Sequence, residues 1–181
     1  MILSDKKILE NIESQDIVIK PFRPEALGTN SYDVHLGRTL AVYSDRVLDA
    51  KKDNKVETFE IPEDGFVLKP DCFYLGVTEE YTESHKHVPF LEGKSSVGRL
   101  GIDIHATAGK GDVGFCNFWT LEISVKQPVR VYPGMPIGQL IYFEVSGDVG
   151  TLYSSKTSAK YNGKTHLPVA SKMFRNFDKL S

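Results

Sequence analysis

The sequence predicts a mainly β protein, built as a sandwich, jelly roll or barrel, with a single helix near the N-terminus. Many short apolar stretches are separated by Gly and Pro, as in antiparallel β folds. No helical pattern alternates with these stretches, so a doubly wound α/β fold is not predicted. The length of 181 residues suits one domain, and no repeat or low-complexity linker divides it. We therefore expect residues 1–181 to form a single domain.

The expected helix comes first along the chain. Ser4 can cap its N-terminus, and Ile8, Leu9 and Ile12 recur at helical spacing until about Ser14. After this point the pattern is that of β-strands. Strands are expected at residues 17–19, 32–36, 40–43, 73–78, 102–106, 116–125 and 137–145.

The strand at 116–125 has two different faces. With a period of two, Trp119, Leu121 and Ile123 point to one side and are expected in the core. Thr120 and Glu122 point to the other side. From about residue 154 the chain is polar, and we expect a flexible C-terminal lid that orders over a ligand.

Composition excludes several classes of function. The net charge of −2 gives no basic surface for nucleic acid or for a membrane. No signal peptide and no transmembrane segment is recognised. The two cysteines, Cys72 and Cys116, are far apart, so a cysteine zinc site is not expected. The simplest interpretation is a cytoplasmic protein with two buried free thiols.

A short segment after one strand combines several groups that bind phosphate. The strand ends at Gly93, and Lys94, Ser95 and Ser96 begin a short helix expected at residues 95–100. Free N–H groups, hydroxyls and an ammonium together can hold a phosphate chain. Arg99 lies on the same helix face as Ser95 and adds a planar fork. The alternative interpretation is an ordinary capped surface turn.

Two carboxylates follow this segment. Asp112 lies in a Gly-rich loop whose backbone can approach a ligand closely. It can bond a sugar hydroxyl, hold a metal-bound water or simply close a turn. Glu122 lies in the middle of a strand, where a partly buried carboxylate suits proton transfer. The alternative is a Glu that faces solvent on a half-exposed strand.

Four other side chains receive structural interpretations. Glu79 and Glu80 are expected on a solvated rim. His85 and His87 are expected in an exposed loop, although they could form a weak metal-binding pair.

Taken together, these segments resemble the dCTP deaminase branch of the dUTPase-like family. The similarity runs nearly end to end, and the run from Gly93 to Gly101 with Glu122 downstream is highly specific. The matching segments are Ile2-Leu3-Ser4-Asp5, 30–37, 93–101, 105–108, 112–115, 120–122, 133–140 and 159–161. The resemblance implies a distorted jelly-roll-like, dUTPase-type β-barrel that assembles as a homotrimer with active sites between subunits.

The resemblance implies hydrolytic deamination of dCTP to dUTP and ammonia, which supplies dUTP for dUMP and dTTP synthesis. Glu122 resembles the general base and acid, Ser95 and the carbonyl of Ala108 resemble the groups that position the water, and Arg99 resembles the group that orients the carboxylate. The zinc deaminase elements, His-x-Glu and Pro-Cys-x-x-Cys, do not occur in the chain. Water activation is therefore expected from a carboxylate and oriented dipoles.

The family also implies substrate contacts. A phosphate and base cradle is formed by Lys94, Ser95, Ser96, Val97, Gly98 and Arg99. The other implied contacts are Asp112 to the deoxyribose 3′-hydroxyl, Thr120 and Leu121 to the cytosine edge, and Gln139, Tyr153 and Lys160 to the triphosphate and lid. Lys164 stands where the family often has Gln, and it could still hold phosphate. Mg²⁺ is expected on the triphosphate and not in a cage of protein side chains. dUTP and dTTP are further candidate ligands.

Three alternatives stay open. The first is a bifunctional dCTP deaminase–dUTP diphosphatase that gives dUMP and pyrophosphate, in which Asp112 helps a second water. After the Ala, members that only deaminate often have His and Arg, whereas bifunctional members often have Gly and an aromatic residue. Gly109 fits the bifunctional pattern and Lys110 fits neither. Gly111 stands where the family usually has a larger apolar residue. A plain dUTPase is less favoured, because residues 164–181 lack the Gly-rich, Arg-bearing arm of that class. A catalytically inert nucleotide sensor need not keep Ser95, Arg99 and Glu122 together.

Overall fold

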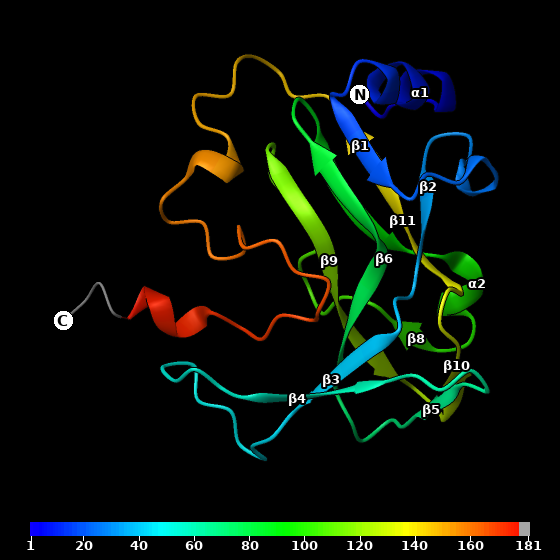
Figure 1. Ribbon diagram of the computed structural model, residues 1–181, viewed down its shortest axis with the longest axis vertical. Coiled ribbons are helices and arrows are strands. Elements are labelled where there is room, and N and C mark those ends of the chain that lie inside the picture. The colour runs from blue at the N-terminus through cyan, green and yellow to red at the C-terminus, as the bar shows by residue number, and fades with distance from the viewer. Residues whose placement is uncertain (178–181) are drawn as a thin grey trace.

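Antiparallel sheets form the body of the protein in the computed structural model, which describes residues 1–177 (Figure 1). The strands are β1 (Ile17–Lys20), β2 (Tyr32–His35), β3 (Thr39–Tyr43), β4 (Val56–Glu60), β5 (Phe66–Leu68), β6 (Tyr74–Ser84), β7 (Val88–Gly93), β8 (Ile102–Asp103), β9 (Phe115–Val125), β10 (Val129–Val131) and β11 (Pro136–Phe143). The helices are α1 (Asp5–Glu13) and α2 (Ser95–Gly98), with 3-10 turns η1 (Pro24–Ala26), η2 (Tyr153–Ser155) and η3 (Met173–Asn176).

The larger sheet has the order β4-β3-β6-β9-β8, and β1 also pairs with β6. A smaller sheet has the order β2-β11-β7, and β5 pairs with β10. One hydrophobic cluster joins the two sheets: Tyr32 and Leu140 come from the smaller sheet, and Leu121 and Ile123 from the larger one. All four side chains are fully buried, so this cluster fixes which face of β9 is turned to the core.

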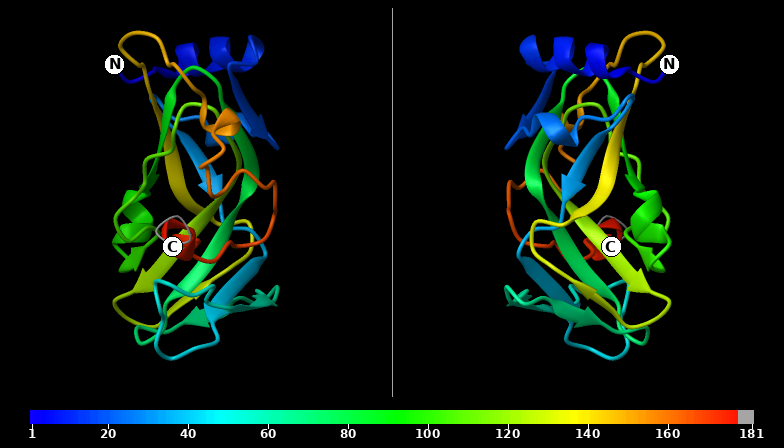
Figure 2. Two further views of the ribbon diagram at one scale, coloured as in Figure 1. Left: turned by 90° about the vertical axis from the view of Figure 1, so that its left-hand side faces the viewer. Right: turned by 90° about the vertical axis from the view of Figure 1, so that its right-hand side faces the viewer.

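The predicted N-terminal helix is confirmed as α1. The Ser4 hydroxyl accepts a hydrogen bond from the Lys7 N–H, and Ile8 is fully buried. In Figure 2, α1 lies across one end of the molecule, where the strands of both sheets begin or end.

The strand predictions are largely confirmed, including the two faces of β9. The strand expected at 102–106 is shorter, because β8 ends at Asp103. The Ala106 N–H donates to the side chain of Glu122 instead of a neighbouring strand. The strands β4, β5 and β10 were not predicted, and the first of these is mostly exposed along its length.

Glu80 contradicts the prediction of a solvated rim. Its side chain is 0% exposed, and its carboxylate lies 2.7 Å from Arg23 Nη1 and 2.6 Å from His35 Nδ1. Glu79 is partly exposed and contacts the same guanidinium at 2.9 Å. The β6–β9 register shifts between Val77 and Tyr81, so the period of two breaks where these two carboxylates lie.

Two other local predictions are corrected. His87 was expected in an exposed loop but is buried, whereas His85 is half-buried. The two free thiols were expected to be buried, but Cys72, in the turn before β6, and Cys116, in β9, are both half-buried. Among residues 1–177 no helix is long and apolar enough to cross a membrane.

Candidate active site

A cavity of about 410 Å³ lies beside β9, and this volume suits a small-molecule ligand. Most of its lining comes from β9, the loop that precedes β9 and the C-terminal tail, and Tyr43, Phe73 and Leu75 add to it. Among the residues assigned to the site from sequence, the lining includes Ala108, Asp112, Thr120, Glu122 and Tyr153. The structure therefore brings both candidate carboxylates, Glu122 and Asp112, to one cavity.

The backbone around β9 positions Glu122. The residue lies opposite Leu75 of β6, and its own N–H donates to the Ile104 carbonyl at 2.8 Å. Its carboxylate oxygen Oε2 accepts a hydrogen bond from the Ala106 N–H, also at 2.8 Å. The carboxylate is thus held toward the loop that carries Ala108. A carboxylate fixed in this way can act as a general base on a nucleobase bound in the cavity.

Two glycines hold the loop against β7. The Leu91 N–H donates to the Gly109 carbonyl at 2.7 Å, and the Gly111 N–H donates to the Pro89 carbonyl at 2.8 Å. A Cβ on Gly109 would lie 2.3 Å from the Leu91 oxygen, and one on Gly111 would lie 2.7 Å from the ring of Trp119. Only glycine fits at either position, which explains the small residue at 111 and fixes the approach of Ala108 and Asp112.

Asp112 forms an ion pair inside the same loop. Lys110 Nζ lies 2.9 Å from Asp112 Oδ1, and both side chains are well exposed. Lys110 also lines the cavity, although the sequence assigned it no role. The loop therefore places an ammonium and a carboxylate side by side at the cavity, a suitable arrangement for a ligand that carries both hydroxyls and phosphates.

The C-terminal tail closes one side of the cavity. The Tyr153 N–H donates to the Val113 carbonyl, and the Tyr153 hydroxyl accepts from the Tyr161 N–H at 3.1 Å. Burial raises the pKa of the Tyr153 hydroxyl, so it remains a neutral hydrogen-bonding group. Farther along, the Val169 N–H donates to the Thr120 hydroxyl at 3.1 Å. The flexibility expected of this lid stays a prediction, and its last residues, 178–181, lie outside the described part of the chain.

Asn117 is the main anchor of the tail. Its Nδ2 donates to the carbonyls of Tyr161 at 3.2 Å and Gly163 at 2.9 Å. Its Oδ1 accepts from the N–H groups of Thr165 and Phe118. This buried amide is satisfied almost entirely by backbone groups, so it specifies one path for the tail over β9.

The segment predicted to bind phosphate, residues 94–99, lies away from this cavity. None of residues 94–99 lines it, and Gln139 does not line it either. The Lys94 ammonium instead pairs with Asp33, whose β2 position lies opposite Gln139 in β11. Figures 1 and 2 show α2 and the tail on different sides of the subunit. The predicted site is thus divided into two groups in one chain. The cavity group is Ala108, Asp112, Thr120, Glu122 and Tyr153, and the α2 group is residues 94–99.

Some predicted contacts cannot be made by side chains in this conformation. Leu121 is 0% exposed and Val97 is 4% exposed, so either could touch a ligand only through its backbone. The Lys164 ammonium lies 3.8 Å from the centre of the Tyr81 ring, and Lys160 accepts a bond from Lys172 at its carbonyl.

Sequence analysis missed several residues of the cavity wall. Besides Lys110, these include Tyr43, Phe73, Asn117, Phe118, Tyr161 and Ser171. Phe73 is an exposed aromatic beside the cavity, at 41%. Its only sequence signal was its place at the start of a predicted strand, and that signal does not distinguish a cavity wall from core.

Comparison with known proteins defines the class. A family model described as dCTP deaminase-like matches residues 2–145, so the chain belongs to the dCTP deaminase-like family. The chain is 51% identical to a protein named dCTP deaminase, dUMP-forming, from Clostridium acetobutylicum over 161 residues, which are 89% of this chain and 90% of that protein. It is 48% identical to a protein of the same name from Hathewaya histolytica, covering 98% of this chain and 100% of that one.

The fold comparison agrees. The crystal structure of 2′-deoxycytidine 5′-triphosphate deaminase from Agrobacterium tumefaciens superposes with a TM-score of 0.62 at 20% identity. The match covers 78% of this chain and 47% of the other, so the chain spans about half the length of that protein. The family model and the relatives confirm the predicted family, and the superposition confirms the predicted mainly β fold.

The predicted product is wrong. Sequence analysis favoured release of dUTP, but the relatives are named dUMP-forming, which corresponds to the bifunctional alternative. The sequence signal for this alternative was Gly109. The structure shows that the backbone at Gly109 packs so closely against β7 that a side chain does not fit there.

Proposed function

We propose that the protein converts dCTP to dUMP, ammonia and pyrophosphate at one site. The observation that supports this proposal most directly is that Glu122 and Asp112, the two ends of segment 112–122, line the same cavity. Two hydrolytic steps need two activated waters, and two separately held carboxylates can supply them. The names of the relatives support the same product.

Glu122 serves the first step. Its carboxylate takes a proton from a water as the water oxygen bonds to C4 of cytosine, and it passes this proton to N3 as the C4=N3 double bond opens. It then moves the proton of the new hydroxyl to the amino group, the C4–N bond to that group breaks, and ammonia leaves. The Ala108 carbonyl lines the same cavity and accepts a hydrogen bond from that water. Ser95 and Arg99 of α2 complete this arrangement, with Arg99 orienting the carboxylate and offsetting the developing charge.

Asp112 serves the second step. A water attacks the α-phosphorus of the uracil nucleotide, the bond to the bridging oxygen breaks, and pyrophosphate leaves. Asp112 accepts the proton of that water, while Lys110 beside it contacts the phosphates. Mg²⁺ prefers hard oxygen ligands, and the triphosphate supplies them, so the ion offsets phosphate charge without a cage of side chains.

The division of the site supports a homotrimer with active sites between subunits. The cavity group lacks residues 94–99, the predicted phosphate cradle, and the α2 group lacks Glu122, the predicted general base. If α2 of a neighbouring copy covers the cavity, both deficiencies are removed at once. The finer contacts of Gln139, Lys160 and Lys164 belong to this assembled site. The cytoplasmic location expected from the sequence stays a prediction.

The direct test is a product assay of the purified full chain with dCTP and Mg²⁺. We expect dUMP, ammonia and pyrophosphate to appear together, with no accumulation of dUTP. A chase with unlabelled dUTP during turnover of labelled dCTP should leave the label in dUMP undiminished if both steps occur in place. Accumulation of labelled dUTP, or no turnover of dCTP, would contradict the proposal.

Subunit mixing tests the shared site. Glu122→Gln and Arg99→Ala trimers should each be inactive. After subunit exchange at equal concentrations, about one quarter of wild-type activity should return, because a site needs Glu122 from one copy and Arg99 from another. Mixtures without recovered activity, under conditions where exchange is shown with tagged subunits, would place both residues in one subunit.

A further inference from the structure

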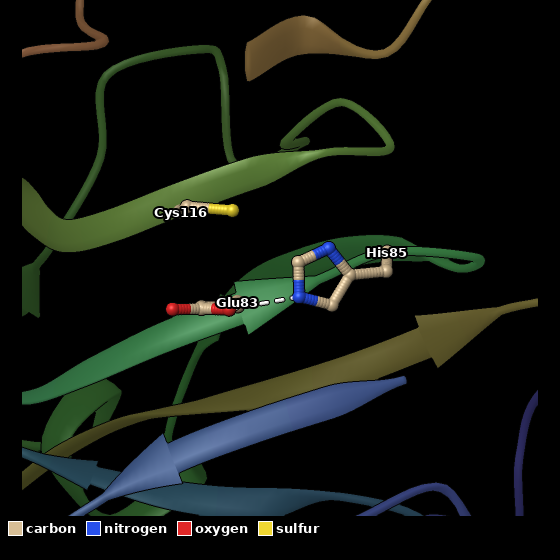
Figure 3. A group of neighbouring side chains, drawn as sticks. All are labelled: Glu83, His85 and Cys116. Carbon is tan, nitrogen blue, oxygen red and sulfur yellow. Dashed lines mark hydrogen bonds and ion pairs between the residues drawn. The ribbon is translucent and has the colours of Figure 1, made fainter. Parts of the chain in front are cut away.

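Three side chains of different chemistry meet on the surface of the β6–β9 ladder. Glu83 of β6 and Cys116 of β9 are direct cross-strand partners, and His85 lies two residues beyond Glu83 (Figure 3). One carboxylate oxygen, one imidazole nitrogen and the thiol sulfur lie within 4.8 Å of one another. None of the three lines the cavity of the proposed active site.

We propose that Glu83, His85 and Cys116 form a binding site for a transition-metal ion of the zinc type. Thiolate, imidazole and carboxylate are the ligands that zinc takes in proteins, and the sulfur and nitrogen disfavour Mg²⁺. The site is therefore chemically distinct from the Mg²⁺ that accompanies the nucleotide. Three protein ligands leave a fourth position for water.

The geometry needs only small movements. In a tetrahedral zinc site, neighbouring ligand atoms are about 3.3–3.5 Å apart. His85 Nε2 and Glu83 Oε2 now lie 2.8 Å apart, joined by a hydrogen bond that the ion would replace. All three side chains are half-buried, so their rotamers can adjust without disturbing the core.

A neighbouring contact orients the carboxylate. The Tyr81 hydroxyl donates to Glu83 Oε1 at 2.8 Å, which leaves Oε2 directed at His85. The carboxylate is thus fixed in place by hydrogen bonds before an ion arrives, as metal ligands commonly are.

Two features oppose binding and set its expected strength. Burial, with Glu83 nearby, raises the pKa of the Cys116 thiol, so the ion must displace a proton. The positive charge of Lys20 on β1 also acts on Glu83. A site with these costs binds more weakly than one with several preformed thiolates.

The test uses Co²⁺ as a spectroscopic probe on the full chain after treatment with a chelator. Co²⁺ should produce a thiolate-to-metal charge-transfer band in the near ultraviolet and intense visible bands of tetrahedral coordination, and Zn²⁺ should displace it. Cys116→Ser should lose the charge-transfer band, whereas Cys72→Ser, which changes the other half-buried free thiol, should keep it. Zn²⁺ should raise the Tm of the wild type and of Cys72→Ser, but not that of Cys116→Ser.

Two further variants and a control separate coordination from folding. His85→Gln should keep the charge-transfer band but weaken Co²⁺ binding by about tenfold or more, and Tyr81→Phe by about tenfold. His166→Gln, at an exposed histidine of the tail, should bind as the wild type does. Equal Co²⁺ spectra for the wild type and Cys116→Ser, or equal affinities for His85→Gln and His166→Gln, would overturn the proposal.

Discussion

Lys110 Nζ lies 2.9 Å from Asp112 Oδ1 at the cavity that also contains Glu122. Because both side chains are well exposed, this ion pair contributes little to stability and can open at low cost. A triphosphate can therefore draw Lys110 away and leave Asp112 free to accept a proton. Under the proposed function, this pair links nucleotide binding to the second hydrolytic step.

Asp112→Asn should uncouple the two reactions. We expect formation of dUMP from dCTP to fall about 100-fold, with dUTP accumulating, because the amide cannot accept the proton of the second water. The measurement is the ratio of dUTP to dUMP during turnover. Asp148→Asn, at an exposed position outside the cavity, is the matched control and should give only dUMP. An unchanged product ratio in Asp112→Asn would remove the carboxylate from this step.

Glu122→Gln should have the opposite selectivity. Deamination of dCTP should fall by about 10²–10⁴-fold, while pyrophosphate release from added dUTP persists, because Asp112 is intact. The Kd for dCTP, measured by calorimetry, should change only a few-fold. Glu57→Gln, on the exposed strand β4, should behave as the wild type. Loss of both activities together in Glu122→Gln would show that one carboxylate serves both steps.

Asn117→Ala should release the tail. Because the amide bonds the backbone at Tyr161, Gly163 and Thr165, its loss should lower the free energy of unfolding by about 1–3 kcal/mol. Trypsin should then cleave the tail faster, which mass spectrometry would locate. Asn162→Ala removes an exposed amide with a single 3.5 Å contact and should change neither quantity. Equal cleavage rates in the two variants would show that the tail is held elsewhere.

The parts of the fold that the sequence predicted are those set by local pattern. The alternation along β9 gave both its core face and its outer face, because burial on a strand repeats every two residues. Glu80 could not be placed in this way, because the register shift in β6 breaks the repeat and its partners Arg23 and His35 are distant in sequence.

The candidate site was predictable as a set of residues but not as an arrangement. The motif at 93–101 marked α2 correctly, yet a motif says nothing about whether α2 and Glu122 face one another in the same chain. The role of Asn117 could not be predicted either. Its partners are backbone groups of the tail, which every residue type has, so no pattern of side chains in the sequence indicates the contact.

Glu80→Ala should strongly destabilise the fold. The change leaves the Arg23 guanidinium and His35 without their buried carboxylate, which costs about 3–5 kcal/mol. The adjacent Glu79→Ala removes a partly exposed contact to the same arginine and should cost less than about 1 kcal/mol. Urea denaturation of both variants measures the difference. Equal losses would mean that the burial of Glu80 contributes nothing specific.

His87 should make stability depend on pH near neutrality. Burial lowers the pKa of its imidazole below the ordinary value of 6.5, and the side chain carries a buried Nδ1 without a described partner. As the pH falls below 6.5, the unfolded chain binds a proton that the folded chain does not, so stability is lost between 6.5 and the lower folded-state pKa. The carboxylates with lowered pKa, Asp16, Glu83 and Asp103, lose their contribution only at lower pH, below their ordinary values of 3.8 to 4.5.

The difference in urea midpoint between the wild type and His87→Gln, followed from about pH 7.5 to 5.5, therefore reports this histidine. We expect the wild type to lose stability across that window and His87→Gln to lose less, because the variant has no imidazole to protonate on unfolding. His166→Gln, at an exposed site of the tail, is the matched control and should keep the wild-type slope. If His87→Gln retained the full slope, the proton taken up on unfolding would have to bind at another group, and the buried imidazole would not be the source of the pH dependence.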